Sequence, residues 1–220
     1  MSSVTVSIEQ AESLARRVLT RHATAESNAA CVACALLAAE IDGQKGHGLS
    51  RLPSYAAQSA SGKVDGHAVP TLEAVAPAAV RIDARDGFAY PALALAVETL
   101  IDRVGVTGIA AAGVHRSHHF GQAGYHVEQL AAAGLIGLLF GNSPKAIAPW
   151  GGTAGVFGTN PIAFAAPRRL APPLLVDLSL SKVARGKVMV AAKQGEPIPE
   201  GWALDSSGKP TTDADAALQG

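Results

Sequence analysis

Two short segments carry most of the side chains that could transfer a proton or hold an anion. In the first, GHGLSRLPSY, His47 and Arg51 stand four residues apart, which would put an imidazole and a guanidinium on one helical face if a helix starts there. An arginine can hold a carboxylate with two parallel hydrogen bonds while a nearby histidine exchanges a proton with the adjacent oxygen. The pair therefore suits a hydroxy or keto acid, although a solvated helix face would show the same residues.

The second segment, HRSHHFGQAGYH at 115–126, contains four of the seven histidines. A metal site, a general base and crowding at the end of a buried strand are all open roles for them. His119 precedes Phe120 and a glycine turn, a place from which a side chain can face a cleft. If the strand continues, His118 and His119 point to opposite sides, so at most one of them shares a site with His115. The segment adds no carboxylate or thiolate, and we therefore predict no metal site.

The composition bounds the possible partners. The chain has 220 residues, is 48% hydrophobic, and balances 18 Lys and Arg against 18 Asp and Glu. No run of like charges predicts a nucleic-acid or membrane surface, and no apolar stretch of about 18 residues predicts a membrane span. Small molecules or copies of the chain itself are the expected partners, and the N-terminal sequence lacks a secretory pattern, so we expect a cytoplasmic protein.

The two cysteines, Cys31 and Cys34, are three residues apart within an alanine-rich stretch. A redox pair normally stands at the N-terminus of a helix, where the thiolate is stabilised. These two cysteines fall inside the predicted helix instead. We expect both to be small buried hydrophobic residues.

The elements that must position these residues change in type along the chain. Ser7 followed by Gln10 is a capping box that opens a helix ending near His22, and Thr24 opens a second helix that Gly43 stops. A third helical piece is predicted before Gly62. We expect residues 1–68 to form a helical N-terminal subdomain.

From residue 69 onward, β-prone runs alternate with amphipathic stretches, which predicts an α/β domain over 69–220. The predicted strands are AVRIDAR, GIAAAGVHRS, LIGLLFGNS, VFGTNPIAFAAP and LLVDLSLS, and the predicted helices are ALALAVETLIDRV and QAGYHVEQLAAAG. No G-x-G-x-x-G follows a predicted strand, and no G-x-x-x-x-G-K-[ST] occurs. Glycines cluster instead at 151–158, either as a ligand-facing loop or as an ordinary connection.

Taken in order, several segments resemble the type 2 malate/L-lactate dehydrogenase family, which includes L-sulfolactate, ureidoglycolate and diketogulonate dehydrogenases. The resemblance runs from about residue 40 to the end of the chain. It is carried by HGLSRLPSY, SHHFGQAGY, GNSPKAIAPWGG, GTNPIAFAAP, LLVDLSLSKVARGKV and GEPIPEGWALDSSGKPTTDADAALQG. It implies a non-Rossmann, sulfolactate-dehydrogenase-like α/β fold, in agreement with the missing glycine fingerprints, and it makes residues 69–220 the cofactor-binding domain.

The resemblance also implies an activity: NAD- or NADP-dependent interconversion of a 2-hydroxy acid and its 2-keto acid, by a homodimer. His47 or His119 would exchange the proton, for which a pKa near 7 is suitable, and Arg51 would hold the substrate carboxylate. Reduction of a cyclic imino acid is the alternative within the family. The residues implied at the cofactor or substrate cleft are Asn142, Ser143, Gly158, Thr159, Asn160, Pro161, Asp177, Leu178 and Ser179. Local turn-stabilising roles remain open for several of these.

Two departures from the family pattern bear on these expectations. Gly46 stands where many members have a serine, so a proton relay through that hydroxyl is not expected. The family continues through a further glycine-rich segment beyond the position of Gly220. The resemblance therefore implies a cofactor domain that is incomplete at its C-terminal end, and an inactive fragment that serves only in binding or dimerisation is the alternative.

Overall fold

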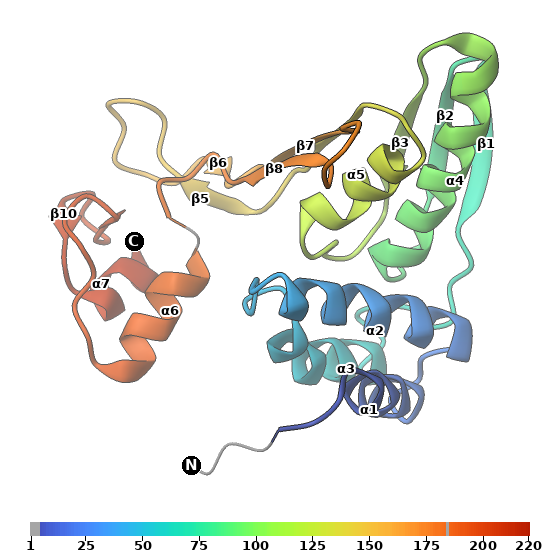
Figure 1. Cartoon of the computed structure of the whole chain (residues 1–220). Helices are drawn as coiled ribbons and strands as arrows, with labels where there is room; N and C mark the ends of the chain where they lie inside the picture. Colours follow the sequence, from blue (N-terminus) through green and yellow to red (C-terminus); the bar gives the residue numbers. More distant parts are fainter. Residues whose placement is uncertain (1–4, 184) are drawn as a thin grey trace. The chain divides into compact units, whose positions relative to one another are not determined.

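The computed structural model describes residues 5–183 and 185–220, which divide into two compact units (Figure 1). The first unit runs up to residue 137 and includes residues 165–174. The second comprises residues 138–164 and 175–220. Each unit is described by itself.

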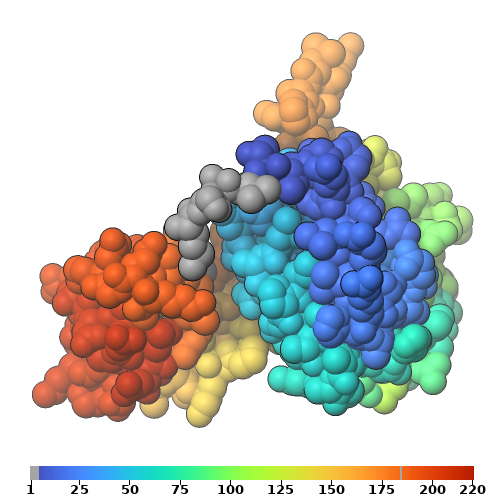
Figure 2. All heavy atoms as spheres, turned by 90° about the horizontal axis from the view of Figure 1, so that it is seen from below, coloured from blue at the N-terminus to red at the C-terminus, as the bar shows by residue number. Residues whose placement is uncertain are grey.

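Helices pack together in the N-terminal part of the first unit. They are α1 (Ile8–Thr20), α2 (Glu26–Ile41), the 3₁₀ turn η1 (Leu49–Arg51) and α3 (Leu52–Ala60). The predicted capping box is present, since the Gln10 N–H donates to Ser7 Oγ and the Ser7 N–H donates to Gln10 Oε1. α2 is apolar on nearly all sides, which is typical of a helix enclosed by others. Figure 2 shows α1, in blue, along the surface of this unit beside α2 and α3.

A three-stranded sheet and two further helices complete the first unit. The order β1-β2-β3 pairs β1 with β2 antiparallel and β2 with β3 parallel. Because parallel neighbours need a crossover, α4 lies between β2 and β3 in the chain. The bounds are β1 Thr71–Ala76, β2 Ala79–Asp83, α4 Ala89–Thr107, β3 Ala111–His115 and α5 Ala123–Ala132.

Most residues of a three-stranded sheet of order β4-β7-β8 belong to the second unit. The unit also contains a hairpin of β5 with β6 and a small C-terminal cluster in which α6 packs on α7. Val188 of α6 and Ala217 of α7 lie in the buried core of that cluster. The bounds are β4 Gly137–Phe140, β5 Lys145–Ile147, β6 Phe157–Gly158, β7 Ile162–Ala166, β8 Leu174–Leu178, α6 Arg185–Gln194, β9 Ala203–Leu204, β10 Pro210–Thr211 and α7 Ala214–Gln219.

The structure confirms the α/β class and every predicted helix and strand, and it adds β1, β5, α6, β9, β10 and α7. The expectation for the cysteines was half wrong. Cys31 is partly buried, and desolvation raises the pKa of its thiol to about 11, but Cys34 is exposed. The predicted boundary between residues 68 and 69 remains a prediction. Within residues 5–183 and 185–220, no helix has the length and apolarity needed to cross a bilayer.

Candidate functional site

The first unit brings the predicted catalytic histidines together. The rings of His47 and His119 stack nearly parallel, with centroids 5.4 Å apart and 9° between the ring planes. Arg51 is near enough for its charge to lower the pKa of His119. The three residues thus share one site, although His47 and His119 are 72 positions apart in the sequence.

A tight turn, not a helix, holds His47 in place. The 3₁₀ turn begins at Leu49, so the hypothesis that His47 and Arg51 share a helical face is wrong. The turn is fixed from two sides: the Leu49 N–H donates to Glu40 Oε2 at 3.0 Å, and Arg51 Nε donates to the Gly46 carbonyl at 2.6 Å. A Cβ at position 48 would clash with the Glu40 carboxylate, so the glycine lets the turn lie against α2.

The segment after β3 leaves the strand geometry at once. β3 ends at His115, so the expected alternation of His118 and His119 does not apply, and both rings contact Tyr55, with centroid distances of 4.9 and 6.2 Å. His118 Nε2 lies 2.8 Å from Gln58 Oε1. His115 remains on the strand, in register with Asp83 of β2.

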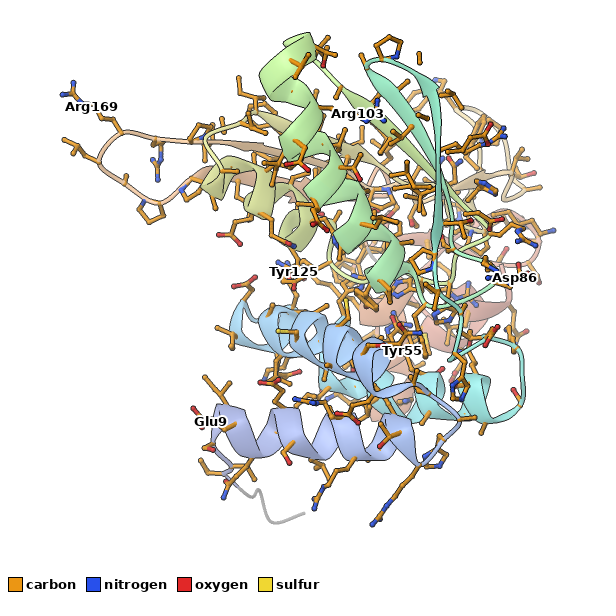
Figure 3. All side chains as sticks on the ribbon, turned by 90° about the vertical axis from the view of Figure 1, so that its right-hand side faces the viewer. Glu9, Tyr55, Asp86, Arg103, Tyr125 and Arg169 are labelled. Carbon is orange, nitrogen blue, oxygen red and sulfur yellow. The ribbon has the colours of Figure 1, made fainter. Side chains whose placement is uncertain are left out.

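Two tyrosines that we did not predict as site residues join this cluster. Tyr55 Oη lies 2.6 Å from His119 Nδ1 and 3.1 Å from Tyr90 Oη, and both tyrosines are 2% exposed. Figure 3 labels Tyr55 beside the helices in the interior of the first unit. The spacing of Arg51 and Tyr55, four residues apart, was a usable signal for Tyr55. Nothing in the local sequence marked Tyr90.

Burial and positive charge keep both histidines of this segment neutral. Desolvation, followed by the charges of Arg51, His47 and His118, lowers the pKa of His119 to about 3. Desolvation, then Lys63 and Arg51, lowers the pKa of His118 to about 4. The pKa near 7 that suits a proton carrier is therefore not found at His119. His118 Nδ1 is also buried without a hydrogen-bond partner among the described residues.

Gly121 lets Tyr90 approach the histidine segment. Its φ is +70°, and a Cβ there would clash with Tyr90 Oη. Gly62 has a similar φ of +74° but open space around it. Gly62→Ala should therefore cost only the left-handed strain of about 1–2 kcal/mol, and Gly121→Ala should cost at least about 1 kcal/mol more. Urea unfolding of the two variants measures the difference, and equal losses would contradict the close approach of Tyr90.

In the second unit, four of the predicted cleft residues form one hydrogen-bond network. The Ser143 N–H donates to Asn160 Oδ1 at 3.1 Å, and Ser143 Oγ lies 3.0 Å from Thr159 Oγ1. Ser179 Oγ donates to the Thr159 carbonyl at 3.3 Å, which joins the end of β8 to the same loop. Asn160 holds a φ of +34°, so this loop is backbone-strained as well as cross-linked.

The other predicted cleft residues border this network. A Cβ at Gly158 would clash with the Ser143 carbonyl, and the Pro161 carbonyl accepts from the Gly141 N–H at 3.0 Å. Asn142 is exposed, as is Leu178 on β8, whereas its neighbour Asp177 is half-buried.

A hollow of about 470 Å³ lies in the second unit next to this network. Thr159 lines it, together with Trp150 and Trp202, the cationic side chains of Lys182 and Arg185, and the glycine-rich loop at 151–155. It thus combines indole rings, positive charge and a glycine-rich loop. Among residues 5–183 and 185–220, no three His, Cys, Asp or Glu side chains gather to hold a metal ion.

Comparisons with known proteins find dehydrogenases and reductases among the relatives of the chain. Over 215 residues the chain is 54% identical to "(2R)-3-sulfolactate dehydrogenase (NADP(+))" of Chromohalobacter salexigens, covering 98% of this chain and 64% of that protein. It is 42% identical over 217 residues to a Delta(1)-pyrroline-2-carboxylate/Delta(1)-piperideine-2-carboxylate reductase of Pseudomonas putida, with coverage of 99% and 64%. The chain therefore spans slightly less than two thirds of the length of these relatives.

Solved structures show the same fold. The delta1-piperideine-2-carboxylate reductase of Pseudomonas syringae pv. tomato matches with a TM-score of 0.95 at 42% identity, covering 99% of this chain and 66% of that one. The sulfolactate dehydrogenase of Methanocaldococcus jannaschii matches with a TM-score of 0.89 at 31% identity, covering 99% and 63%. The predicted sulfolactate-dehydrogenase-like fold is confirmed. Residues 6–220 match the family model described as malate/L-lactate dehydrogenase, and the chain belongs to that family.

Proposed function

We propose that this chain acts as an NAD(P)-dependent oxidoreductase that interconverts a 2-hydroxy acid and its 2-keto acid. The observation that supports this most is the meeting of His47 and His119 beside Arg51, because a 2-keto acid needs a cation for its carboxylate and a proton for its carbonyl oxygen. The named substrates of the relatives, sulfolactate and cyclic imino acids, all carry a carboxylate next to the carbon that is reduced or oxidised.

The roles of the chain's own residues follow from their chemistry. Arg51 binds and orients the substrate carboxylate, and the histidine pair hydrogen-bonds to the oxygen at C2 and exchanges its proton. When bound, the nicotinamide supplies or accepts the hydride at C2. The second unit offers groups that fit such a cofactor, since Lys182 and Arg185 suit phosphates and the indole rings suit a flat heterocycle. We assign Ser143, Thr159, Asn160 and Ser179 to that cofactor region.

NADP is the cofactor we favour, because the 54% identical relative is named for it. Sulfolactate-like hydroxy acids are the favoured substrates for the same reason. Reduction of a cyclic imino acid is the second candidate, supported by the 42% identical reductases. A homodimer is a proposal that rests on the family resemblance, and a cytoplasmic location remains a prediction from the sequence.

The test is binding followed by turnover. NADPH and NADH are titrated by fluorescence, and loss of reduced cofactor is then followed with 3-sulfopyruvate, oxaloacetate, pyruvate and Δ¹-piperideine-2-carboxylate. A ketone without a carboxylate is the control substrate. We expect Arg51→Ala to raise KM for the acids by about 10- to 100-fold, the effect of losing hydrogen bonds to a charged group. Cofactor binding without turnover of any acid would overturn the proposal. An unchanged KM for the acids in Arg51→Ala would also overturn it.

A further inference from the structure

The hydrogen bonds around His119 determine which ring nitrogen carries its proton. The Gly121 backbone N–H, which can only donate, points at His119 Nδ1 from 3.3 Å. Nδ1 must therefore hold a lone pair, and Tyr55 Oη, 2.6 Å from the same nitrogen, must also donate to it. The proton of the neutral ring consequently sits on Nε2.

Tyr90 completes the chain of donors. Once the Tyr55 hydroxyl has given its hydrogen to Nδ1, its oxygen accepts from the Tyr90 hydroxyl at 3.1 Å. Burial raises the pKa of Tyr55 and raises that of Tyr90 well above its ordinary value, so both hydroxyls keep their hydrogens. Gly121 contributes twice, as a donor to His119 and as the residue whose missing Cβ leaves room for Tyr90.

This arrangement opposes a second proton on His119. A hydrogen on Nδ1 would face the Gly121 N–H and would force the Tyr55 hydroxyl to turn away. The other groups facing the ring give no compensation: Arg51 carries a positive charge, and His47 and His118 add further imidazoles. The ring is thus built to remain neutral and to offer one donor, Nε2–H.

We propose that Tyr90, Tyr55 and Gly121 hold His119 as a neutral hydrogen-bond donor to the substrate, which leaves the proton exchange that the family resemblance implies to His47. This inference rests on the proposed oxidoreductase function. In the reducing direction, C2 gains a hydride from the reduced nicotinamide as the carbonyl π bond breaks, and its oxygen takes the proton from the His47 imidazolium. His47 becomes neutral, and His119 keeps its Nε2 hydrogen throughout. Tyr55 and Tyr90 are positioning residues in this scheme.

Nitrogen NMR of the full chain tests the inference without any cofactor or substrate. Histidine side chains are labelled with ¹⁵N, and the His119 signals are assigned by their loss in His119→Gln. We expect the wild-type ring to be protonated on Nε2 and unprotonated on Nδ1 from neutral pH down to about pH 4, consistent with a pKa of about 3. In Tyr55→Phe the Nδ1 signal should move and the pKa of His119 should rise by about one unit, the worth of one lost hydrogen bond.

The chain has three tyrosines, and the third, Tyr125, lies on α5 and is not part of the Tyr90–Tyr55–His119 chain of hydrogen bonds (Figure 3). It therefore provides a matched control. Tyr125→Phe should leave both His119 nitrogens unchanged, and Tyr90→Phe should give a smaller shift than Tyr55→Phe. A proton on Nδ1 in the wild type, titration of His119 near neutral pH, or equal responses to Tyr55→Phe and Tyr125→Phe would overturn the inference. The wild-type measurement is decisive even if a variant does not fold. Failure of the oxidoreductase assay would leave the tautomer result standing, so the two failures are distinguishable.

Discussion

His47→Gln is expected to lower kcat for reduction of the keto acid by about 10²- to 10⁴-fold, the usual contribution of a positioned acid or base. His119→Gln is expected to lower it by no more than about 10-fold, because the glutamine amide still offers an N–H donor near the place of Nε2. Neither glutamine can titrate. The comparison therefore separates a group that transfers a proton from one that only hydrogen-bonds to the substrate.

His119→Ala is the variant that removes the donor as well. It should lower kcat by about 10²- to 10³-fold, comparable to the loss of one donor to a developing oxyanion. The measurement is steady-state kinetics over a range of pH for all three variants. We expect His119→Gln to keep the pH dependence of wild-type kcat/KM and His47→Gln to lose it. The reverse pattern, with His119→Gln losing both rate and pH dependence, would make His119 the proton carrier.

Local signals in the sequence were sufficient where one short segment decides the structure. Ser7 and Gln10 fix the start of α1 through their own side chains, and Gly43 and Gly62 end helices by adopting positive φ. The fold class followed from the alternation of strands and helices after residue 69. His47 and His119 were both proposed as proton carriers, as alternatives, through the resemblance to a family, and nothing in their spacing predicted that the two rings stack.

The rest depended on contacts that no short window contains. Tyr55 and Tyr90 are 35 positions apart, and Tyr55 and His119 are 64 apart, so their hydrogen bonds exist only after α3, α4 and the segment following β3 have packed together. The lowered pKa of His119 has the same origin, since it comes from burial and from Arg51. The turn at His47 was not predicted from the four-residue spacing of His47 and Arg51. It is stabilised by the Glu40 carboxylate, which lies in the preceding helix and outside that spacing.

The second large effect is a loss of stability in acid. At neutral pH, His119 is neutral in both the folded and the unfolded chain. The two states bind the same number of protons at this residue, so the free energy of unfolding does not depend on pH through it. Below the ordinary value of 6.5 the unfolded state binds a proton that the folded state, with a pKa of about 3 at His119, does not accept. As the pH is lowered below 6.5, His119 therefore reduces the free energy of unfolding by about 1.4 kcal/mol per pH unit. This reduction ends only near pH 3, where the folded protein also binds the proton. His118, with a pKa of about 4, adds a smaller amount because solvent partly screens it.

Urea unfolding at pH 7, 6, 5 and 4 measures this effect as the difference between wild type and His119→Gln. The variant lacks the titrating ring, so its free energy of unfolding should fall less steeply as the pH is lowered. Below pH 6.5, the difference between wild type and variant should change by about 1.4 kcal/mol per pH unit in favour of the variant. Taking the difference cancels the other acid-sensitive contacts, such as Asp83, whose pKa is lowered to about 2 first by its hydrogen bond to Arg116. His22→Gln, which removes an imidazole outside the cluster, is the control. Parallel curves for wild type and His119→Gln would mean that His119 is protonated in the folded protein, which would also remove the basis for treating it as a permanently neutral donor.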